Sequence, residues 1–391
     1  MRQFQFRVGH ENFFLIHVSL IPVVGSVGEQ KTKPTQSSVR DLRGLGLTPD
    51  VIACRSSKPL DSVVKEKLSM FCHVAPSNVI AVPDCSSVHH VPILLEQQGL
   101  LECLKTRLNV KSVGGSEYFD KWKQRVERYD RLEATVKIGV VGKYTSLSDS
   151  YLSLIKALQH GSLENNRKLQ IVWIEAEELE SGTKDKNPPA YKAAWQSLKS
   201  ADGILVPGGF GERGTLGKIL ACQFARESKV PYFGICLGLQ IAVIEFCRNV
   251  LGLPNANSTE FDSECEDPVV IFMPEISKTH MGGTMRLGLR PTKFVEAKSI
   301  VRELYGGKDI IQERHRHRYE VNTDYVGRLK AKGFRFVGHD EKGERMEIAE
   351  LDDHPFFVAV QYHPELISRP LRPSPLFVGF VKASIAHSAH A

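Results

Sequence analysis

The 391-residue sequence predicts an α/β protein whose C-terminal two-thirds form a doubly wound domain. Three observations support this fold class. Strand-like segments alternate with helix-like ones along most of the chain. Several of the strand-like segments run directly into glycine-containing turns, where ligands bind in sheets of this kind. The length is also sufficient for two or three domains, each with a core of its own.

The composition is that of an ordinary globular protein. Hydrophobic residues make up 42% and charged residues 25%, and 51 basic against 45 acidic residues leave a net charge of +6. Such a mild charge is compatible with anionic small ligands, with phosphates and with nucleic acid, so it does not distinguish them. The eight cysteines include no CxxC pair, which disfavours zinc ribbons and thioredoxin-type sites and fits reduced thiols in the cytosol.

The apolar segment Phe13–Val24 raises the question of a leader sequence. His17 interrupts it, and no clean cleavage site of small residues follows, so we interpret it as a buried strand rather than a signal peptide. No stretch reaches the roughly 18 unbroken apolar residues of a membrane span. We therefore expect a cytoplasmic protein without a membrane anchor.

Residues 1–110 have the pattern of βαβ units, and the first strand-like piece has the apolar character of a central strand. Strands are predicted at Phe13–Leu20, Val51–Cys54 and Val79–Val82, and helices at Ser37–Leu45, Leu60–Phe71 and Val91–Gln98. A charged, amphipathic stretch follows. We expect a first domain at 1–110, a helical linker at 111–135 and a second domain at 136–391.

The second domain opens with a buried strand that begins at Val136 and runs into a glycine turn. Helices are predicted at Ser150–Gly161, Ala190–Lys199 and Gly214–Ser228, and strands at Leu169–Glu175, Gly203–Val206, Val230–Ile235, Arg335–His339, Met346–Leu351 and Phe356–Tyr362. The alternation in its first half is that of a doubly wound sheet.

Cys236 carries the strongest local signal. A buried strand ends in Gly-Ile-Cys-Leu-Gly, and an apolar helix, Leu239–Phe246, begins at once. The glycines permit a sharp, strained turn, and the helix N-terminus then favours the thiolate form of the cysteine. The alternative is a buried structural cysteine at a strand-to-helix junction.

His363 and Glu365 supply the partners that a thiol nucleophile needs. They lie two residues apart in Gln-Tyr-His-Pro-Glu, so on an extended chain both side chains face the same way. Glu365 can then orient His363 while the second ring nitrogen faces sulfur. A histidine by itself is more often a packed or surface residue; the upstream cysteine is what favours a catalytic role.

A glycine-rich turn, Pro207–Gly211, follows another strand. Its glycines let backbone N–H groups approach a ligand, and the amides of Gly209 and Leu237 could form an oxyanion hole. Many glycine-rich turns are only turns, so this motif is weak evidence when taken alone.

Together these motifs resemble those of class I glutamine amidotransferases, and more closely those of CTP synthases. The resemblance extends from about Phe4 to Phe380. Its other segments are Gly-Glu-Gln-Lys-Thr-Lys-Pro-Thr-Gln at 28–36, Val-Gly-Lys-Tyr at 141–144, Ala-Asn-Ser-Thr-Glu-Phe at 256–261, Met-Gly-Gly-Thr-Met-Arg-Leu-Gly at 281–288 and Arg-His-Arg-His-Arg-Tyr-Glu-Val-Asn at 314–322. It implies a class I glutamine amidotransferase domain preceded by the C-terminal part of a P-loop-type α/β amidoligase (synthase) domain.

The resemblance also implies residue roles. Cys236 matches the nucleophile, and His363 and Glu365 match its base and orienter. The matching glutamine-binding positions are Gly209, Leu237, Gly238, Leu239, Gln240, Glu260 and Arg318. Glu260 and Arg318 suit the ammonium and carboxylate of an amino acid. Without the resemblance, the alternating arginines at 314, 316 and 318 would indicate a surface strand or a phosphate patch.

For the nucleotides, the resemblance implies a UTP or CTP site and contacts with ATP. The matching pyrimidine-nucleotide positions are Lys31, Thr32, Lys33, Pro34, Thr35, Gln36 and Lys67, and Asp84 matches backbone near the ATP adenine. Lysines near a triphosphate are electrostatically reasonable. A Lys-Thr-Lys-Pro-Thr segment alone would be a plain polar turn.

The implied reaction is the ATP-dependent amination of UTP to CTP with ammonia from glutamine. The implied ligands are glutamine, ATP with Mg²⁺, UTP, GTP as activator and CTP as feedback inhibitor, with a homo-tetramer that forms filaments; nucleic acid and membrane partners are not expected. No residue of this chain is assigned to a metal. Smaller departures from the family are Leu239 and Leu366, where Met and Phe are usual.

One larger departure concerns the family's P-loop and acidic Mg²⁺ ligands. The sequence contains no GxxxxGK[ST], and Met1 aligns with the interior of the synthase domain, so we expect an N-terminally truncated chain that keeps glutaminase activity at most. The alternatives are a non-catalytic isoform that assembles with full-length subunits, and another amidotransferase or γ-glutamyl hydrolase. The Lys-Thr-Lys-Pro-Thr-Gln segment disfavours the last two.

Overall fold

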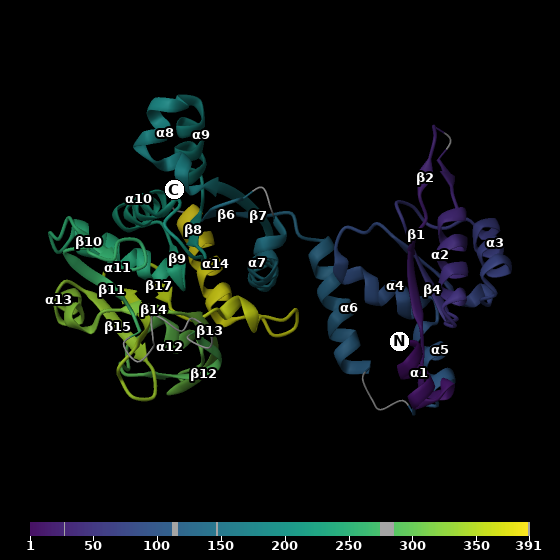
Figure 1. The fold of residues 1–391 in the computed structure, drawn as a ribbon. Coiled ribbons are helices and arrows are strands. Elements are labelled where there is room, and N and C mark those ends of the chain that lie inside the picture. Colours follow the sequence, from purple (N-terminus) through teal and green to yellow (C-terminus); the bar gives the residue numbers. More distant parts are fainter. Residues whose placement is uncertain (27, 112–115, 146–147, 274–284, 390–391) are drawn as a thin grey trace. The chain divides into compact units, whose positions relative to one another are not determined.

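A computed structural model of the chain describes residues 1–26, 28–111, 116–145, 148–273 and 285–389. The chain divides into two compact units, Met1–Arg131 and Leu132–Ala391 (Figure 1). Residues 112–115 of the expected linker and residues 281–284 of the motif at 281–288 lie outside the described residues. The predicted mixture of helices and strands is confirmed in both units.

The first unit contains a three-stranded parallel sheet in the order β1-β4-β5. Its elements are α1 (Arg2–Val8), β1 (Ile16–Leu20), β2 (Val23–Val24), β3 (Glu29–Gln30), α2 (Lys33–Gly44), β4 (Val51–Ser56), α3 (Ser62–Cys72), β5 (Val79–Pro83), α4 (Val91–Gln97), α5 (Leu100–Leu108) and α6 (Ser116–Asp130). One side of the sheet packs on α2 and α3 around Val39, Ile52 and Leu68.

Strand β1 differs from the expectation of a central strand. Among the described strands it pairs only with β4, so it lies at an edge, and Val18 and Leu20 are 66% and 62% exposed. Its inward positions are polar and hydrogen-bonded to α2, with Ser19 Oγ 2.7 Å from Thr35 Oγ1. An apolar composition alone did not reveal which side of this strand is covered.

The second unit is built on a nine-stranded sheet in the order β13-β12-β15-β16-β17-β9-β8-β6-β7. The strands are β6 (Thr135–Gly142), β7 (Lys168–Glu175), β8 (Gly203–Val206), β9 (Tyr232–Ile235), β12 (Arg286–Phe294), β13 (Ile310–His317), β15 (Phe334–His339), β16 (Met346–Leu351) and β17 (Phe357–Val360). From β17 to β7 the neighbours are parallel, and the strands from β13 to β17 pair antiparallel.

Helices cover both faces of this sheet, as a doubly wound fold requires. The helices are α7 (Leu152–Glu164), α8 (Ser181–Lys186), α9 (Pro188–Lys199), α10 (Thr215–Glu227), α11 (Leu237–Asn249), α12 (Ile300–Leu304), α13 (Val326–Ala331) and α14 (Pro375–Ser388). One core lies between the sheet and α9, α10 and α11, and the other between the sheet and α7 and α14. A small sheet of β10 (Ala256–Ser258), β11 (Asp267–Phe272) and β14 (Tyr319–Val321) completes the unit.

Strand β13 shows how local pattern and burial agree. Its residues alternate strictly between exposed and buried, because successive side chains of a strand point to opposite faces. The buried positions hold Glu313, His315 and His317, whereas Arg314 and Arg316 are exposed. The basic run is therefore a half-buried strand whose inner face is polar.

Candidate active site

The carboxyl ends of three neighbouring parallel strands bring the candidate site together. Strand β9 lies between β8 and β17, with Gly234 opposite Val206 and Ile235 opposite Val360. Each strand is followed by one of the motifs found in the sequence: the glycine-rich turn after β8, the cysteine after β9 and the histidine after β17. This is the edge at which doubly wound sheets bind ligands.

Cys236 has a strained backbone at the junction of β9 and α11. Its φ of 53° and ψ of −99° lie where non-glycine residues rarely occur. The conformation is held by the Cys236 amide, which donates to the Val360 carbonyl at 2.6 Å, and by the helix it caps. The first N–H groups of α11 have no acceptor within the helix, so they are oriented to favour negative charge beside the sulfur.

His363 and Glu365 form a buried pair. Nδ1 of His363 lies 2.7 Å from Oε1 of Glu365, whereas Nε2 is buried and makes no hydrogen bond within the described residues. Burial lowers the pKa of His363, but the adjacent Cys236 sulfur and the Glu365 carboxylate outweigh burial and raise that pKa to about 11. The geometry therefore favours an imidazolium beside the cysteine.

Gly208 marks the close approach of the turn to both reactive side chains. A Cβ added there would lie 2.8 Å from Cε1 of His363 and 3.4 Å from Cβ of Cys236. Only glycine leaves room for the cysteine and the histidine to meet beneath this turn. The glycine-rich turn therefore belongs to the site.

The three residues open on a cavity of about 230 Å³. It is lined by Ser150, Tyr151, Ser153, Leu154, Pro207, Gly208, Gly209, Phe210, Cys236, Arg316, His363, Glu365 and Leu366. Arg316 lies over the Phe210 ring, and its backbone carbonyl lies 3.8 Å from the sulfur of Cys236. The cavity thus has glycine backbone on one side and an exposed cation on another.

The residues expected to bind glutamine fall into two groups. Gly209 lines the cavity, and the nearby Glu260 accepts a hydrogen bond from the Gly211 amide at 2.8 Å. Leu237 and Gly238 belong to the turn of helix that begins at Cys236. Arg318 is half-buried. Its charge lowers the pKa of Tyr319, whereas the charge of Glu260 raises that pKa.

Leu239 and Gln240 do not line the cavity. Leu239 lies fully in the core, and the Gln240 amide donates to the Tyr319 carbonyl at 3.0 Å and to Oε1 of Gln361 at 3.4 Å. The side-chain nitrogen Nε2 of Gln361 lies in turn 3.6 Å from the sulfur of Cys236. In this structure Gln240 contacts the site through Gln361.

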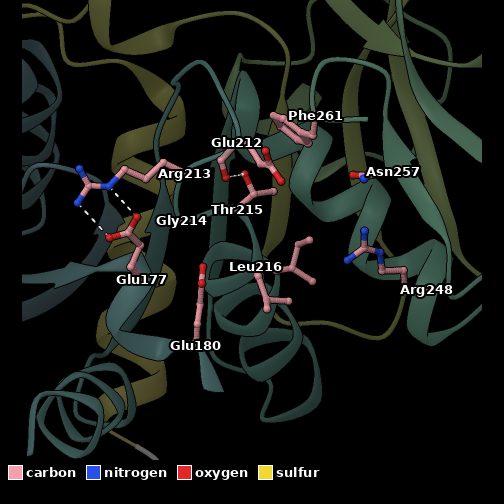
Figure 2. A pocket seen from close by; sticks show the side chains of 11 residues that line it. Glu177, Glu180, Glu212, Arg213, Gly214, Thr215, Leu216, Arg248, Asn257 and Phe261 are labelled. Atoms are coloured by element: carbon pink, nitrogen blue, oxygen red, sulfur yellow. Dashed lines mark hydrogen bonds and ion pairs between the residues drawn. The ribbon is translucent and has the colours of Figure 1, made fainter. Parts of the chain in front are cut away.

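A larger cavity, of about 590 Å³, is lined in part by residues 212–216, which follow the glycine-rich turn (Figure 2). It contains none of the three reactive residues. Glu177 and Arg213 form a bidentate pair at its rim, at 2.7 and 3.0 Å, and Arg248 and Asn257 lie across from them. We place the chemistry in the smaller cavity, because only that cavity contains a nucleophile with a base.

The residues expected to bind nucleotides lie in the first unit. Lys33 and Gln36 line a cavity of about 440 Å³ with Ser37, Arg40, Arg43 and Phe71. Lys31 forms an ion pair with Glu29 at 2.6 Å, and the charges of Lys31 and Lys67 both lower the pKa of Glu29. The segment is the start of helix α2, not a turn.

Three further predicted positions have partners within the first unit. Thr32 and Thr35 are buried, and Asp84 pairs with Arg55 at 2.7 Å. Across the described residues, no group of three or more His, Cys, Asp or Glu side chains is arranged to hold a metal ion. Nor is any helix in the described ranges long and apolar enough to cross a membrane.

Sequence reasoning missed Gln361, Arg316, Lys143 and Lys218. Gln361 had a usable signal, because it lies two residues before His363 in a segment that the sequence predicts as the end of a strand, where alternate side chains face the same side. Lys143 stands in the Val-Gly-Lys-Tyr motif at 141–144, which carried no role for this lysine, and Lys218 had no signal at all. Lys218 follows a glycine in an apolar helix and is 2% exposed, a burial that only the packing of α10 reveals.

Known families match both units. The family described as "Glutamine amidotransferase class-I" matches residues 146–383, and the one described as "CTP synthase N-terminus" matches residues 1–110. A solved Trypanosoma brucei structure, the CTPS glutaminase domain with bound acivicin, is 41% identical with a TM-score of 0.60. That likeness covers 64% of this chain and 94% of the other.

Close relatives match over nearly the whole length of this chain. CTP synthase 1 of Homo sapiens is 56% identical over 390 residues, which are 100% of this chain and 66% of the human protein. CTP synthase of Eremothecium gossypii is 54% identical over 396 residues, which cover 98% of this chain and 68% of that protein. The chain therefore spans about two-thirds of the length of these relatives.

Proposed function

Since the chain belongs to the CTP synthase family, we propose that its second unit hydrolyses glutamine and that the ammonia released is used to aminate UTP to CTP. The observation that carries the first part is the meeting of Cys236, His363 and Glu365 at the carboxyl ends of β9 and β17. A strained cysteine at a helix N-terminus, a histidine with a free Nε2 and an orienting carboxylate are the parts of a thiol nucleophile.

In the proposed first step, the Cys236 sulfur attacks the side-chain amide carbon of glutamine. The C–S bond forms, and the carbonyl π electrons move to oxygen, giving a tetrahedral oxyanion. The amides of Gly209 and Leu237 are the proposed donors to that oxygen. His363 then gives its proton to the leaving nitrogen, and ammonia departs as the thioester forms.

In the second step, a water molecule attacks the thioester carbon. His363 accepts a proton from the water, and collapse of the second tetrahedral intermediate returns the electron pair to sulfur and releases glutamate. Glu365 keeps the histidine ring oriented throughout, because its carboxylate holds Nδ1 at 2.7 Å. The proposed roles of Glu260 and Arg318 are to pair with the ammonium and carboxylate of the substrate.

The amination half of the proposal rests on the family and on the first unit. The names of the relatives imply a reaction with glutamine, ATP and UTP. We propose Lys31, Lys33 and Lys67 as contacts to a pyrimidine nucleotide, Gln36 and Asp84 as further nucleotide contacts, CTP and GTP as regulators, and tetramers as the assembled form. Among the described residues no group of three or more His, Cys, Asp or Glu side chains could hold a metal ion, and no residue of this chain is assigned to Mg²⁺.

Replacing the nucleophile tests the glutaminase proposal. We expect the purified chain to release glutamate from glutamine and Cys236→Ala to lose at least about 10³-fold of that activity, because no other group can form the thioester. Cys247→Ala is the matched control, since this buried thiol belongs to the opposite end of α11. Undiminished hydrolysis by Cys236→Ala would refute the assignment.

CTP formation is tested separately, with ammonia, ATP, UTP and Mg²⁺ supplied in solution. We expect this chain alone to form no CTP, because its sequence contains no GxxxxGK[ST] phosphate loop. Measurable CTP from the chain alone would show that ATP is held by other residues. Glutamate release without CTP would leave the glutaminase proposal intact.

A further inference from the structure

Lys218 is a buried lysine for which no ion pair is found among the described residues. The residue lies in the first turn of α10 and is 2% exposed, and within the described residues its Nζ makes no hydrogen bond or ion pair. Burying an unpaired charge is unfavourable, so such groups are usually paired or neutral. The position of Lys218 therefore calls for an explanation.

The ammonium lies behind the glycine-rich turn of the candidate site. Its Nζ is 3.9 Å from the position that a Cβ on Gly209 would occupy, and Cε of Lys143 is 4.0 Å from the same position. Lys143 is already engaged, because its ammonium donates to the Phe210 carbonyl. Two cations thus approach Gly209 from the side on which its Cβ would lie, and within the described residues a hydrogen bond is found for only one of them.

The nearby carboxylates are engaged elsewhere. Glu175 accepts hydrogen bonds at 3.1 Å from the amides of Tyr144 and Thr145, and Glu260 accepts from the Gly211 amide at 2.8 Å. Burial first, and then Lys143, lower the pKa of Lys218 to about 8, while Glu175 and Glu260 act in the opposite direction. Below that pH the ammonium remains charged and lacks an anion.

We propose that Lys218 is a positioning residue of the glutaminase site, whose buried charge acts through Gly209 to stabilise the oxyanion of the tetrahedral intermediate. The inference rests on the proposed function, because the missing anion is the one formed on the substrate during the reaction. A fixed positive charge in a water-excluded region stabilises developing negative charge far more than it would in water. Lys218 itself forms and breaks no bond.

Lys218→Met tests this, because methionine keeps most of the volume and removes the charge. We expect kcat for glutamine hydrolysis to fall about tenfold with little change in KM, since the charge acts on the intermediate rather than the bound substrate. We also expect Tm to rise or stay unchanged, because an uncompensated charge is removed from the interior. Lys382→Met, at an exposed lysine of α14 in the same unit, is the matched control and should alter neither quantity.

The pH profile separates an electrostatic role from a structural one. The parent protein should lose kcat as pH rises through about 8, where Lys218 loses its proton. Lys218→Met should lack that alkaline limb, and Lys218→Arg should keep more activity than Lys218→Met and also lack the limb, because arginine does not titrate there.

Three results would overturn the inference. These are full activity in Lys218→Met, an unchanged alkaline limb in both variants, or a loss of activity in Lys218→Met that parallels a fall in Tm. An active parent with an unaffected Lys218→Met variant rejects this inference alone. An inactive parent protein rejects the proposed function and this inference with it.

Discussion

Cys236, the proposed nucleophile, shows at the scale of one residue how backbone strain and packing position a thiol. Its backbone conformation is unfavourable for any residue with a side chain, and it persists because β9, β17 and α11 hold the flanking peptide groups. The conformation places the thiol above the sheet edge next to His363. The proposed reactivity of this thiol rests on how these three elements meet.

Glu365 is expected to act by orienting the histidine. Glu365→Gln keeps the size of the side chain but removes the charge that holds the imidazolium, so we expect kcat for glutamine hydrolysis to fall roughly 10²-fold, with little change in KM. Steady-state kinetics of the purified variant check this. A variant with the parent kcat would show that His363 needs no orienting carboxylate.

Glu313 is a buried carboxyl on the inner face of β13. Burial raises its pKa to about 8; the Tyr305 hydroxyl, which donates at 2.5 Å, lowers it, and the Glu365 carboxylate raises it further. The folded protein binds the proton of Glu313 more tightly than the unfolded chain does. Protonation of Glu313 therefore contributes to the free energy of unfolding at low pH, and this contribution is lost as pH rises through about 8.

Glu313→Gln removes this titration and tests its sign. We expect the difference in Tm, variant minus parent, to be larger at about pH 9 than at about pH 5 by about 5 °C or more. Thermal unfolding of both proteins across that range measures it, with Glu344→Gln, an exposed glutamate of the same unit, as control. Parallel Tm profiles for Glu313→Gln and its parent would contradict a buried, protonated carboxyl.

At the scale of secondary-structure elements, the site is a set of strand-to-loop junctions. Local sequence pattern predicted β8, β9 and the strand before His363 within a few residues, because each is apolar and ends at a glycine or a turn. It did not predict α14, an apolar helix that covers one face of the sheet, or the short strands β10, β11 and β14. Short elements depend on partners that are distant in sequence.

Gly208 tests how tightly the turn fits over the reactive residues. Gly208→Ala would bring a methyl group within 2.8 Å of the His363 ring, so we expect kcat/KM to fall at least about tenfold through displacement of the histidine while the fold persists. Gly182→Ala, at a helical glycine with open space around it, is the control and should leave activity unchanged. Equal activities in the two variants would show that the turn can move away.

At the scale of the whole molecule, the chain consists of two units with separate cores and separate candidate sites. The described residues that line the cavity at Cys236 belong to Leu132–Ala391, and so do both cores of the nine-stranded sheet. The basic cavity beside α2 belongs to Met1–Arg131. The proposed glutamine chemistry and the proposed nucleotide binding therefore belong to different units.

The second unit should therefore fold and act by itself. We expect a fragment of residues 132–391 to unfold cooperatively and to hydrolyse glutamine with a kcat similar to that of the whole chain, because its sheet and triad are complete. The solved Trypanosoma brucei glutaminase domain is a relative of similar extent. Calorimetry and a glutamate assay measure both properties, and an unfolded or inactive fragment would show that the first unit is needed.

The sequence by itself determined the α/β class and the positions of most central strands along the chain, and it predicted the candidate triad, because these are encoded locally in apolar segments, glycine turns and short motifs. Only the tertiary structure decided that β1 lies at an edge, that His315 and His317 are buried, that Gln240 contacts Gln361 and that Lys218 lies uncompensated behind Gly209. Burial and electrostatic environment depend on which distant segments pack together, and no local pattern records that.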